Sequence, residues 1–378
     1  MPSASVLTLE KKAIQHYKSL PPNEVKYYLF ILLKSIRNEG LENTEDILNA
    51  LLPLLEHLNA LHQLINQPQV SSESTLELLS IINQQLQQLK EKANTHTILA
   101  ACSTALIRFI GVITGIITGV FGIIIGSLVG LIYGIYRGHP LSGLWSGFFI
   151  GTSLGSIMGY RLPNKLLKDG YSRKLAFGID GIQEALTYTN LEYSIFGSSP
   201  KPFSTYLDDV KKEVRELFAS DEAFEDFLEH DTYYRINAFL ASFIGQPILH
   251  GFAGKHVYLQ FKIKEKDFIV EYTPGATDPN EPPVQTELRQ VSGFKLLEML
   301  ALHRKLLETH KPTVGQVLRK MKVGDNDCTS YVNKVLICTN QDGVQMDRDE
   351  NLKPFGKVVV NTLEALGPFN RDFFKTGF

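Results

Sequence analysis

Two long stretches in the middle of the chain contain no charged residue, and both carry glycine at a regular interval. The first runs from Phe109 to Tyr136 and the second from Leu141 to Tyr160. Their glycines are Gly111, Gly115, Gly119, Gly122, Gly126, Gly130 and Gly134, then Gly143, Gly147, Gly151, Gly155 and Gly159. Interior glycines cost a water-soluble helix roughly 0.5–1 kcal/mol each relative to alanine. In lipid the backbone must satisfy its own hydrogen bonds, so the helix forms regardless. The pattern predicts two membrane-spanning helices whose glycine stripes allow close packing.

A helical hairpin accommodates both stretches. Each reaches the length of about 20 residues that a bilayer requires, and Arg137-Gly138-His139-Pro140 lies between them. Pro140 cannot continue the first helix, so the polar tetrapeptide predicts a turn. We therefore expect a transmembrane hairpin over residues 98–162. The alternative is a buried glycine-rich helical pair inside a soluble core.

The basic residues around the hairpin predict its orientation. They comprise Lys90, Lys92 and Arg108 before it, and Arg161, Lys165, Lys168, Arg173 and Lys174 after it. The turn contributes only Arg137 and His139. Because cytoplasmic segments carry an excess of lysine and arginine, we expect an integral membrane protein with both termini in the cytosol.

Other global features fit a reducing compartment. The first residues, Met1 to Ser5, lack the basic patch and apolar core of a secretory signal. Three cysteines, at positions 102, 328 and 338, are too few for a disulfide framework. The net charge of the chain, −2, gives no reason to expect a nucleic-acid partner.

The N-terminal part, residues 1–97, has helical apolar periodicity throughout. Helices are predicted at Val6–Leu20, from Asn23 to Arg37, from Thr44 to Pro68 and at Ser72–Ala93. A small helical bundle is the favoured interpretation, because the apolar seam covers only a few heptads. A protein-binding coiled coil is the alternative.

The C-terminal part, residues 163–378, mixes both periodicities. Residues 172–245 look helical, whereas Val257–Ile263 and Asp267–Tyr272 have the composition of a β-hairpin. Further helices are expected at Gly293–Thr309, Val314–Met321 and Thr329–Leu336, and an undecided element near Val358–Leu366. The predicted class is α+β, with an N-terminal bundle, a transmembrane hairpin and a mainly helical C-terminal domain that holds a small antiparallel sheet.

Two residues in this C-terminal domain have the setting of a thiol catalyst. Cys328 opens a predicted helix, whose dipole favours the nucleophilic thiolate. His256 opens the first strand and is the candidate base. Gln260, on the same strand face, or Glu271, from the paired strand, would orient the imidazole. The backbone amides of Cys328 and Thr329 would contribute to an oxyanion hole.

Cys328 and His256 also allow other interpretations. Cys328 fits equally a small buried residue at a helix start, and His250 is a rival base. Cys102 and Cys338 are expected to be structural. No metal-ligand spacing and no phosphate loop occurs, so neither a metal nor a cofactor is predicted.

Three segments resemble the circularly permuted papain-like cysteine enzymes of the lecithin:retinol acyltransferase and desumoylating-isopeptidase types. They are Gly254–Leu259, Asp267–Tyr272 and Asn326–Val332, within residues 245–340. The resemblance implies that His256 and Cys328 are the family's histidine and cysteine. Asp327 stands where the family usually has asparagine, and Glu271 is the nearest counterpart of a second histidine.

These patterns together lead to one functional hypothesis and an alternative. The first is a membrane-anchored cysteine-dependent hydrolase or acyltransferase, acting on a protein or acyl-lipid substrate at the cytosolic face. The alternative is a non-enzymatic interaction or remodelling protein that forms homo-oligomers through its glycine stripes. In either case the lipid bilayer is the expected partner. A third possibility combines the same features in a bacterial effector delivered into a host cell.

Overall fold

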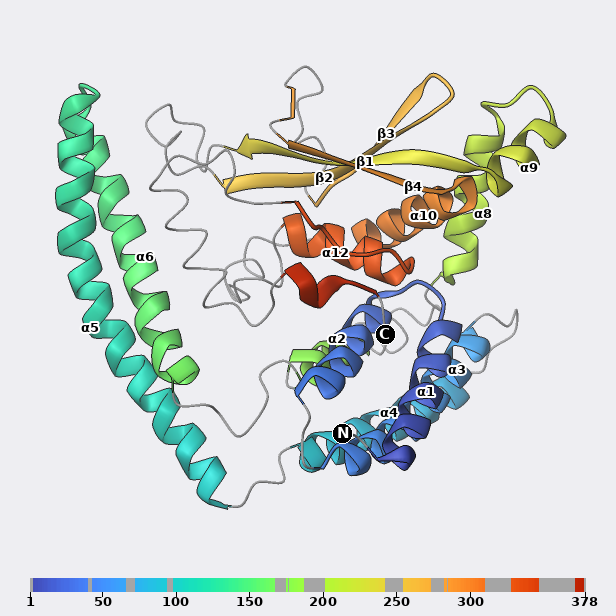
Figure 1. Ribbon diagram of the computed structural model, residues 1–378, viewed down its shortest axis with the longest axis horizontal. Coiled ribbons are helices and arrows are strands. Elements are labelled where there is room, and N and C mark those ends of the chain that lie inside the picture. The colour runs from blue at the N-terminus through green and yellow to red at the C-terminus, as the bar shows by residue number, and fades with distance from the viewer. Residues whose placement is uncertain are drawn as a thin grey trace.

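The computed structural model describes residues 3–39, 43–65, 72–93, 98–166, 175, 177–186, 201–241, 254–272, 282–283, 285–309, 328–346 and 371–376. Within these ranges the protein is α+β and mostly helical, with a four-stranded antiparallel sheet. Figure 1 shows a helical bundle, a long helical pair beside it, and a sheet whose lower face is covered by helices. The predicted helix at Val314–Met321 and the element near Val358–Leu366 lie outside the described residues.

The N-terminal bundle comprises four helices, as predicted. They are α1 (Ala4–Ser19), α2 (Glu24–Glu39), α3 (Thr44–Ile65) and α4 (Ser72–Ala93). Side chains cap two of them: Ser3 Oγ accepts from Val6 N, and Asn23 Oδ1 accepts from Lys26 N at 2.9 Å. Residues 29–33 of α2 are all buried, so this helix is enclosed on every side rather than on one face.

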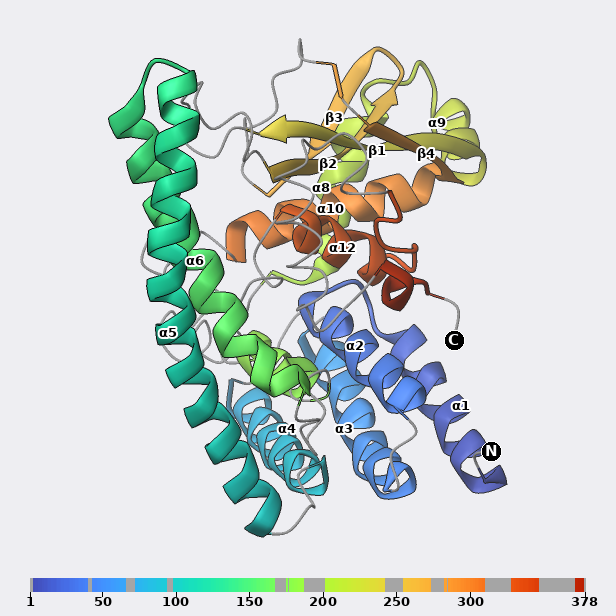
Figure 2. The ribbon, with the colours of Figure 1, turned by 60° about the vertical axis from the view of Figure 1, so that its left-hand side comes forward.

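Two long helices, α5 (Ile98–Tyr136) and α6 (Pro140–Leu166), pack on each other as an antiparallel pair. The pair stands beside the rest of the molecule in both Figure 1 and Figure 2. Its turn at Gly138 lies at the end opposite to the one from which the chain enters and leaves.

The sheet has the strand order β3-β2-β1-β4. Its strands are β1 (Asp231–Ala241), β2 (Gly254–Ile263), β3 (Lys266–Val270) and β4 (Gln285–Ser292). The predicted β-hairpin is confirmed as β2 and β3, which pair from Leu259↔Val270 to Ile263↔Lys266. Lys264 turns the chain between them with a φ of 54°.

The prediction of helix throughout residues 172–245 is wrong for its last part. Residues 177–186, α8 (Phe203–Arg215) and α9 (Asp221–Glu229) are helical, but residues 231–241 form β1. Tyr234, Ile236 and Ala238 are fully buried and alternate with exposed Tyr233 and Arg235, which is the period of a strand. Strand β4 was not predicted, because its mostly polar sequence has little apolar alternation.

Two helices cover one face of the sheet: α10 (Gly293–Thr309) and α12 (Cys328–Cys338) (Figure 1). The structure thus confirms the helices predicted at these two places. α12 packs against β2, whose Val257 and Leu259 are buried, as are Val332 and Leu336 of α12. This packing holds α12, which carries Cys328, against the sheet.

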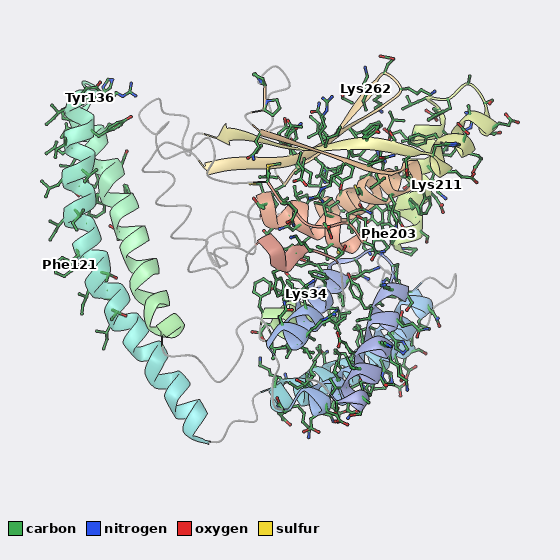
Figure 3. The ribbon with its side chains drawn as sticks, viewed as in Figure 1. Lys34, Phe121, Tyr136, Phe203, Lys211 and Lys262 are labelled. Atoms are coloured by element: carbon green, nitrogen blue, oxygen red, sulfur yellow. The ribbon has the colours of Figure 1, made fainter. Side chains whose placement is uncertain are left out.

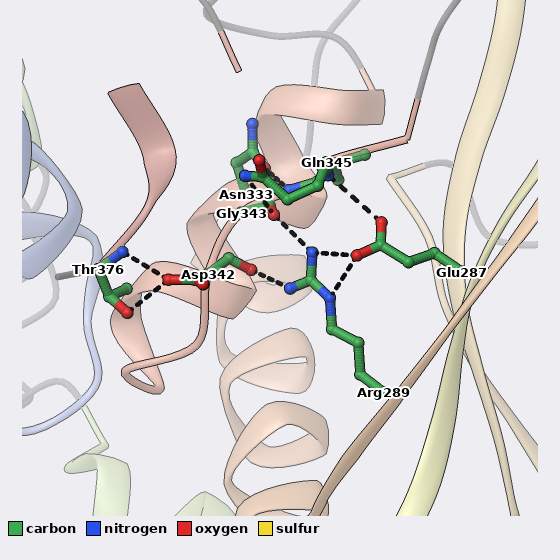
Figure 4. A network of polar contacts seen from close by, with 8 residues as sticks. Glu287, Arg289, Asn333, Asp342, Gly343, Gln345 and Thr376 are labelled. Carbon is green, nitrogen blue, oxygen red and sulfur yellow. Dashed lines mark hydrogen bonds and ion pairs between the residues drawn. The ribbon is translucent and has the colours of Figure 1, made fainter. Parts of the chain in front are cut away.

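A polar network ties the end of α12 to strand β4 (Figure 4). Arg289 of β4 pairs with Glu287 at 2.7 Å and donates to the carbonyl oxygens of Asp342 and Gly343. Glu287 also accepts from Gln345 N at 3.3 Å. The network holds the segment after α12 against the sheet edge, so that α12 keeps one orientation.

Removing the guanidinium from this network is expected to destabilise the fold. In Arg289→Met, the half-buried Glu287 carboxylate and two carbonyls lose their partner, which costs about 1–3 kcal/mol. Urea unfolding followed by circular dichroism measures the loss. Arg235→Met, an exposed arginine on the other face of the same sheet, is the matched control, and equal stability of the two variants would contradict this role.

The bundle and the C-terminal elements share one hydrophobic core. Lys334 of α12 forms a buried ion pair with Glu24 of α2 at 2.8 Å. Tyr27 stacks on Phe374 of the short helix η2 (Arg371–Phe374), with ring centroids 6.3 Å apart. The division into residues 1–97, 98–162 and 163–378 stays a prediction, and the packing joins its first and last parts through α2.

Candidate functional site

The interface between α5 and α6 is built from glycines that face one another. A Cβ placed on Gly126 would overlap the carbonyl oxygen of Gly147, and one on Gly147 would overlap that of Gly126. The same relation holds for Gly130 with Gly143 and for Gly122 with Gly151. The two backbones are therefore in direct contact, and only glycine fits at these positions.

Two threonines add hydrogen bonds across the pair. Thr118 Oγ1 donates to Gly155 O at 2.5 Å, and Thr114 Oγ1 donates to Gly159 O at 2.6 Å. Such bonds are favourable where water is absent, because the carbonyls gain a second partner beyond their helical one.

Opposite this interface, α5 exposes a continuous apolar surface. Its exposed large side chains are Ile113, Ile116, Ile117, Val120, Phe121, Ile124, Ile125, Leu128, Val129, Ile132 and Ile135. Among the described residues, one segment, Ile113–Tyr136, is long and apolar enough to cross a membrane, and 17% of its most apolar window is buried. A core helix of a soluble protein would be mostly buried, so the exposure of this surface sets the segment apart from such a helix.

The turn between the two helices is polar and flanked by aromatic residues. Gly138 adopts a φ of +76°, and His139 N donates to Gly134 O, which ends α5 in the manner of a glycine C-cap. Arg137 lies over the ring of Tyr133, and Tyr136 is largely exposed at the end of the pair (Figure 3). Such aromatic and basic residues are typical of a membrane–water interface.

The predicted nucleophile, Cys328, is the first residue of α12 and is half-buried. Thr329 and Ser330, which follow it, are buried. The first turn of the helix thus places its amides and the positive end of its dipole around the thiol. Tyr331 lies one turn further on, on the same side of the helix as Cys328.

An imidazole that the sequence reasoning missed lies beside this turn. His303 of α10 bonds through Nδ1 to the hydroxyl of Tyr331 at 2.7 Å, in a buried position. Burial lowers the pKa of His303 to about 4, an effect that the nearby Glu271 carboxylate opposes. Tyr272 packs edge-on against Tyr331. The sequence signal for His303 is weak, because it is a single histidine on a helix of mixed polarity and belongs to no motif.

The other predicted site residues are distributed differently. Glu271 directly follows β3 and is buried, and its carboxylate opposes the lowering of the His303 pKa. Gln260 accepts from Asn237 Nδ2 at 2.7 Å and alternates with Leu259 and Phe261, which face α12. By this alternation Gln260 lies on the strand face opposite to that of Leu259 and Phe261, and its place at the site stays a prediction.

The histidine of the predicted dyad is placed only through its backbone. His256 lies on β2, paired with Phe239 of β1, and its side chain lies outside the described residues. Asn326, Asp327 and the rival base His250 also lie outside them.

Cys338 ends α12 in a setting that suits the structural role expected of it. Its thiol donates to Asn23 O at 3.0 Å, and burial raises its pKa to about 12, so it remains a protonated thiol. Within the described part of the chain, no three His, Cys, Asp or Glu residues group as a metal site would require.

Comparison of the chain with protein-family models, with curated proteins and with solved structures finds no match.

Proposed function

We propose that the chain is a membrane-anchored protein in which α5 and α6 cross the bilayer as a two-span hairpin. The exposed apolar surface of α5 carries this proposal. Its 24-residue segment Ile113–Tyr136 is about 36 Å long, enough to cross the hydrocarbon core of a bilayer, which is about 30 Å thick. α6 exposes Leu141, Trp145 and Phe149 on its own outer side, which supports a second span.

Both flanks of the hairpin then lie on one side of the membrane. The two connections leave the pair at the end opposite Gly138 (Figure 1), and basic residues concentrate at that end in the sequence. By the positive-inside rule, the bundle and the sheet domain face the cytosol.

A glycosylation assay in microsomes tests this topology. An acceptor tripeptide in an extended loop inserted between Gly138 and His139 is expected to be glycosylated, because the turn reaches the lumen. The same insert before Ser3 or after Thr376 should stay unmodified. Modification at the termini and not at the turn would show the opposite orientation. Modification at none of the sites would contradict the spanning hairpin.

We further propose that the cytosolic body carries a cysteine-dependent hydrolase or acyltransferase site at Cys328. The thiolate would attack the carbonyl of an ester or amide, and the leaving alcohol or amine would take a proton from an imidazolium. Water or a second acceptor would then release the acyl group from the thioester. The supporting observation is a half-buried cysteine in the first turn of an 11-residue helix.

Two histidines are candidates for the base at this site. His256 has the sequence order of the permuted papain-like enzymes. His303 has a described contact with α12, through Tyr331, and an acidic neighbour in Glu271. Glu271 serves as the orienting group in either case.

Labelling with an acyl-thioester mimic that captures nucleophilic thiols tests the site. Cys328→Ala is expected to abolish labelling, whereas Cys338→Ala, which removes a buried thiol, should leave it unchanged. His256→Gln and His303→Gln then identify the base by which of them slows labelling at least about tenfold. If Cys328→Ala labels like the parent, the chain is an anchored scaffold without this chemistry.

Self-association through glycine stripes is not part of this proposal. The glycines at 122, 126 and 130 face those of α6 within the same chain, so a second copy would have to use a different surface.

A further inference from the structure

A cavity of about 410 Å³ lies where the N-terminal bundle meets the sheet domain. Its walls come from the turn between α1 and α2, from the first turns of α8 and α10, and from Asn340 after α12. Its size is within the range of small-molecule sites, and such sites occur preferentially where separate parts of a fold meet. Phe203, which Figure 3 labels, marks its position at the start of α8.

We propose that this cavity binds a small amphipathic anion, a carboxylate or phosphate ester with a short apolar body. This site is separate from Cys328 and does not depend on the chemistry proposed there.

Positive charge dominates the polar lining. Three lysines, Lys18, Lys26 and Lys295, face a single carboxylate, that of Glu298. Glu298 pairs with Lys295 at 2.5 Å, so its charge is already compensated. An anion in the cavity would meet the remaining ammonium groups, and the low dielectric around them would strengthen the attraction.

Among these residues, Lys26 gives the strongest argument for a bound anion. Its side chain is only 2% exposed, and its Nζ donates to Leu20 O at 2.7 Å. Among the described residues, no carboxylate lies within ion-pair distance of it. Burial lowers the pKa of Lys26 to about 8, so at neutral pH the ammonium remains charged at a desolvation cost. A bound anion would offset that cost.

The start of α8 adds to the positive potential. The residue before this 13-residue helix is Pro202, which supplies no side-chain cap, so amides of the first turn remain available at Phe203 and Ser204. The positive end of the helix dipole therefore lies at the cavity wall, where it favours an anion.

An apolar wall completes the site and sets the ligand class. Leu20, Phe203 and Leu207 line the cavity together with Pro21 and Pro22. An inorganic anion alone would leave these apolar side chains exposed to water. An aryl or short acyl group joined to the anion would cover them and displace water.

Binding of 4-fluorobenzoate and 4-fluorophenyl phosphate to the full-length protein in neutral detergent, followed by fluorine NMR, tests the proposal. At least one of the two anions is expected to bind, and whichever binds more tightly identifies the head group. The uncharged 4-fluorobenzamide, which has the same ring, should bind at least about tenfold more weakly. Raising the salt concentration should weaken the binding of the two anions and leave the binding of the amide unchanged.

Variants separate this cavity from non-specific attraction. Lys26→Met is expected to weaken anion binding about tenfold or more, because a charge-assisted contact is lost. Lys18→Gln, at the exposed rim, should weaken it less and should fold normally, which keeps the test valid if Lys26→Met does not fold. Lys262→Gln, on the β2–β3 hairpin at the far end of the body (Figure 3), is the control. Equal binding of anion and amide, or parental anion affinity in folded Lys18→Gln and Lys26→Met, would overturn the proposal.

Discussion

Replacing Gly126 and Gly147 together by leucine is expected to force α5 and α6 apart. Each new Cβ would overlap a backbone carbonyl of the facing helix rather than a movable side chain. Overpacking costs about 1–3 kcal/mol per site where neighbours can shift, and here the neighbours are backbone. We therefore expect a loss of roughly 2–6 kcal/mol for the pair. Titration with SDS from a mild detergent, followed by emission of Trp145, measures it, because this single tryptophan lies on α6.

The matched control adds bulk to the other side of the same helix. Val120→Leu with Val129→Leu enlarges two side chains on the exposed face of α5, and its SDS midpoint should equal that of the parent. The glycine double variant should unfold at a clearly lower SDS fraction. The same midpoint for all three proteins would mean that the glycine contacts do not hold the pair together.

Acidification from pH 6.5 to pH 4 is expected to destabilise the body strongly. His62 and His303 each have a pKa lowered by burial to about 4, whereas an unfolded histidine titrates at 6.5. Between these values the unfolded chain binds protons that the folded chain does not, so stability falls as the pH falls. Above pH 6.5 both imidazoles are neutral in both states and the full stability is retained. Each shift corresponds to on the order of 3 kcal/mol.

Unfolding midpoints in urea at pH 7, 6, 5 and 4.5 measure this effect. His62→Gln and His303→Gln should each flatten the dependence, since each removes one proton-binding group from the unfolded state. His230→Gln is the control. That histidine is exposed, and a hydrogen bond to Asp226 raises its pKa, so its removal should not reduce the acid loss. A pH-independent midpoint in the parent would contradict the assignment of neutral buried imidazoles.

Local patterns in the sequence predict most of the helices and the β2–β3 hairpin at one edge of the sheet. The proline pair at 21–22 and the cap at Asn23 separate α1 from α2. Strand β1 could have been found from the alternation of Tyr234, Ile236 and Ala238. β4 could not, because it is held by pairing with β1 and by the polar Arg289 network rather than by an apolar pattern along its sequence.

The candidate site was only partly predictable, for a related reason. Helical periodicity places Cys328 at a helix start, which the structure confirms. Contacts between elements far apart in sequence decide which polar groups surround it. Gln260 bonds to Asn237 on the opposite face, and His303 reaches Tyr331 from a helix that carries no sequence motif. The cavity at the bundle junction has the same origin, because α1, α8 and α10 meet only in the folded chain.

Extraction of the full-length protein from membranes at alkaline pH, followed by flotation with liposomes, tests the anchor most directly. We predict that the chain stays with the lipid after extraction and floats with it, because the exposed surface of α5 has no aqueous counterpart. Recovery as a monodisperse 42.4 kDa monomer in buffer without detergent would contradict the membrane hairpin.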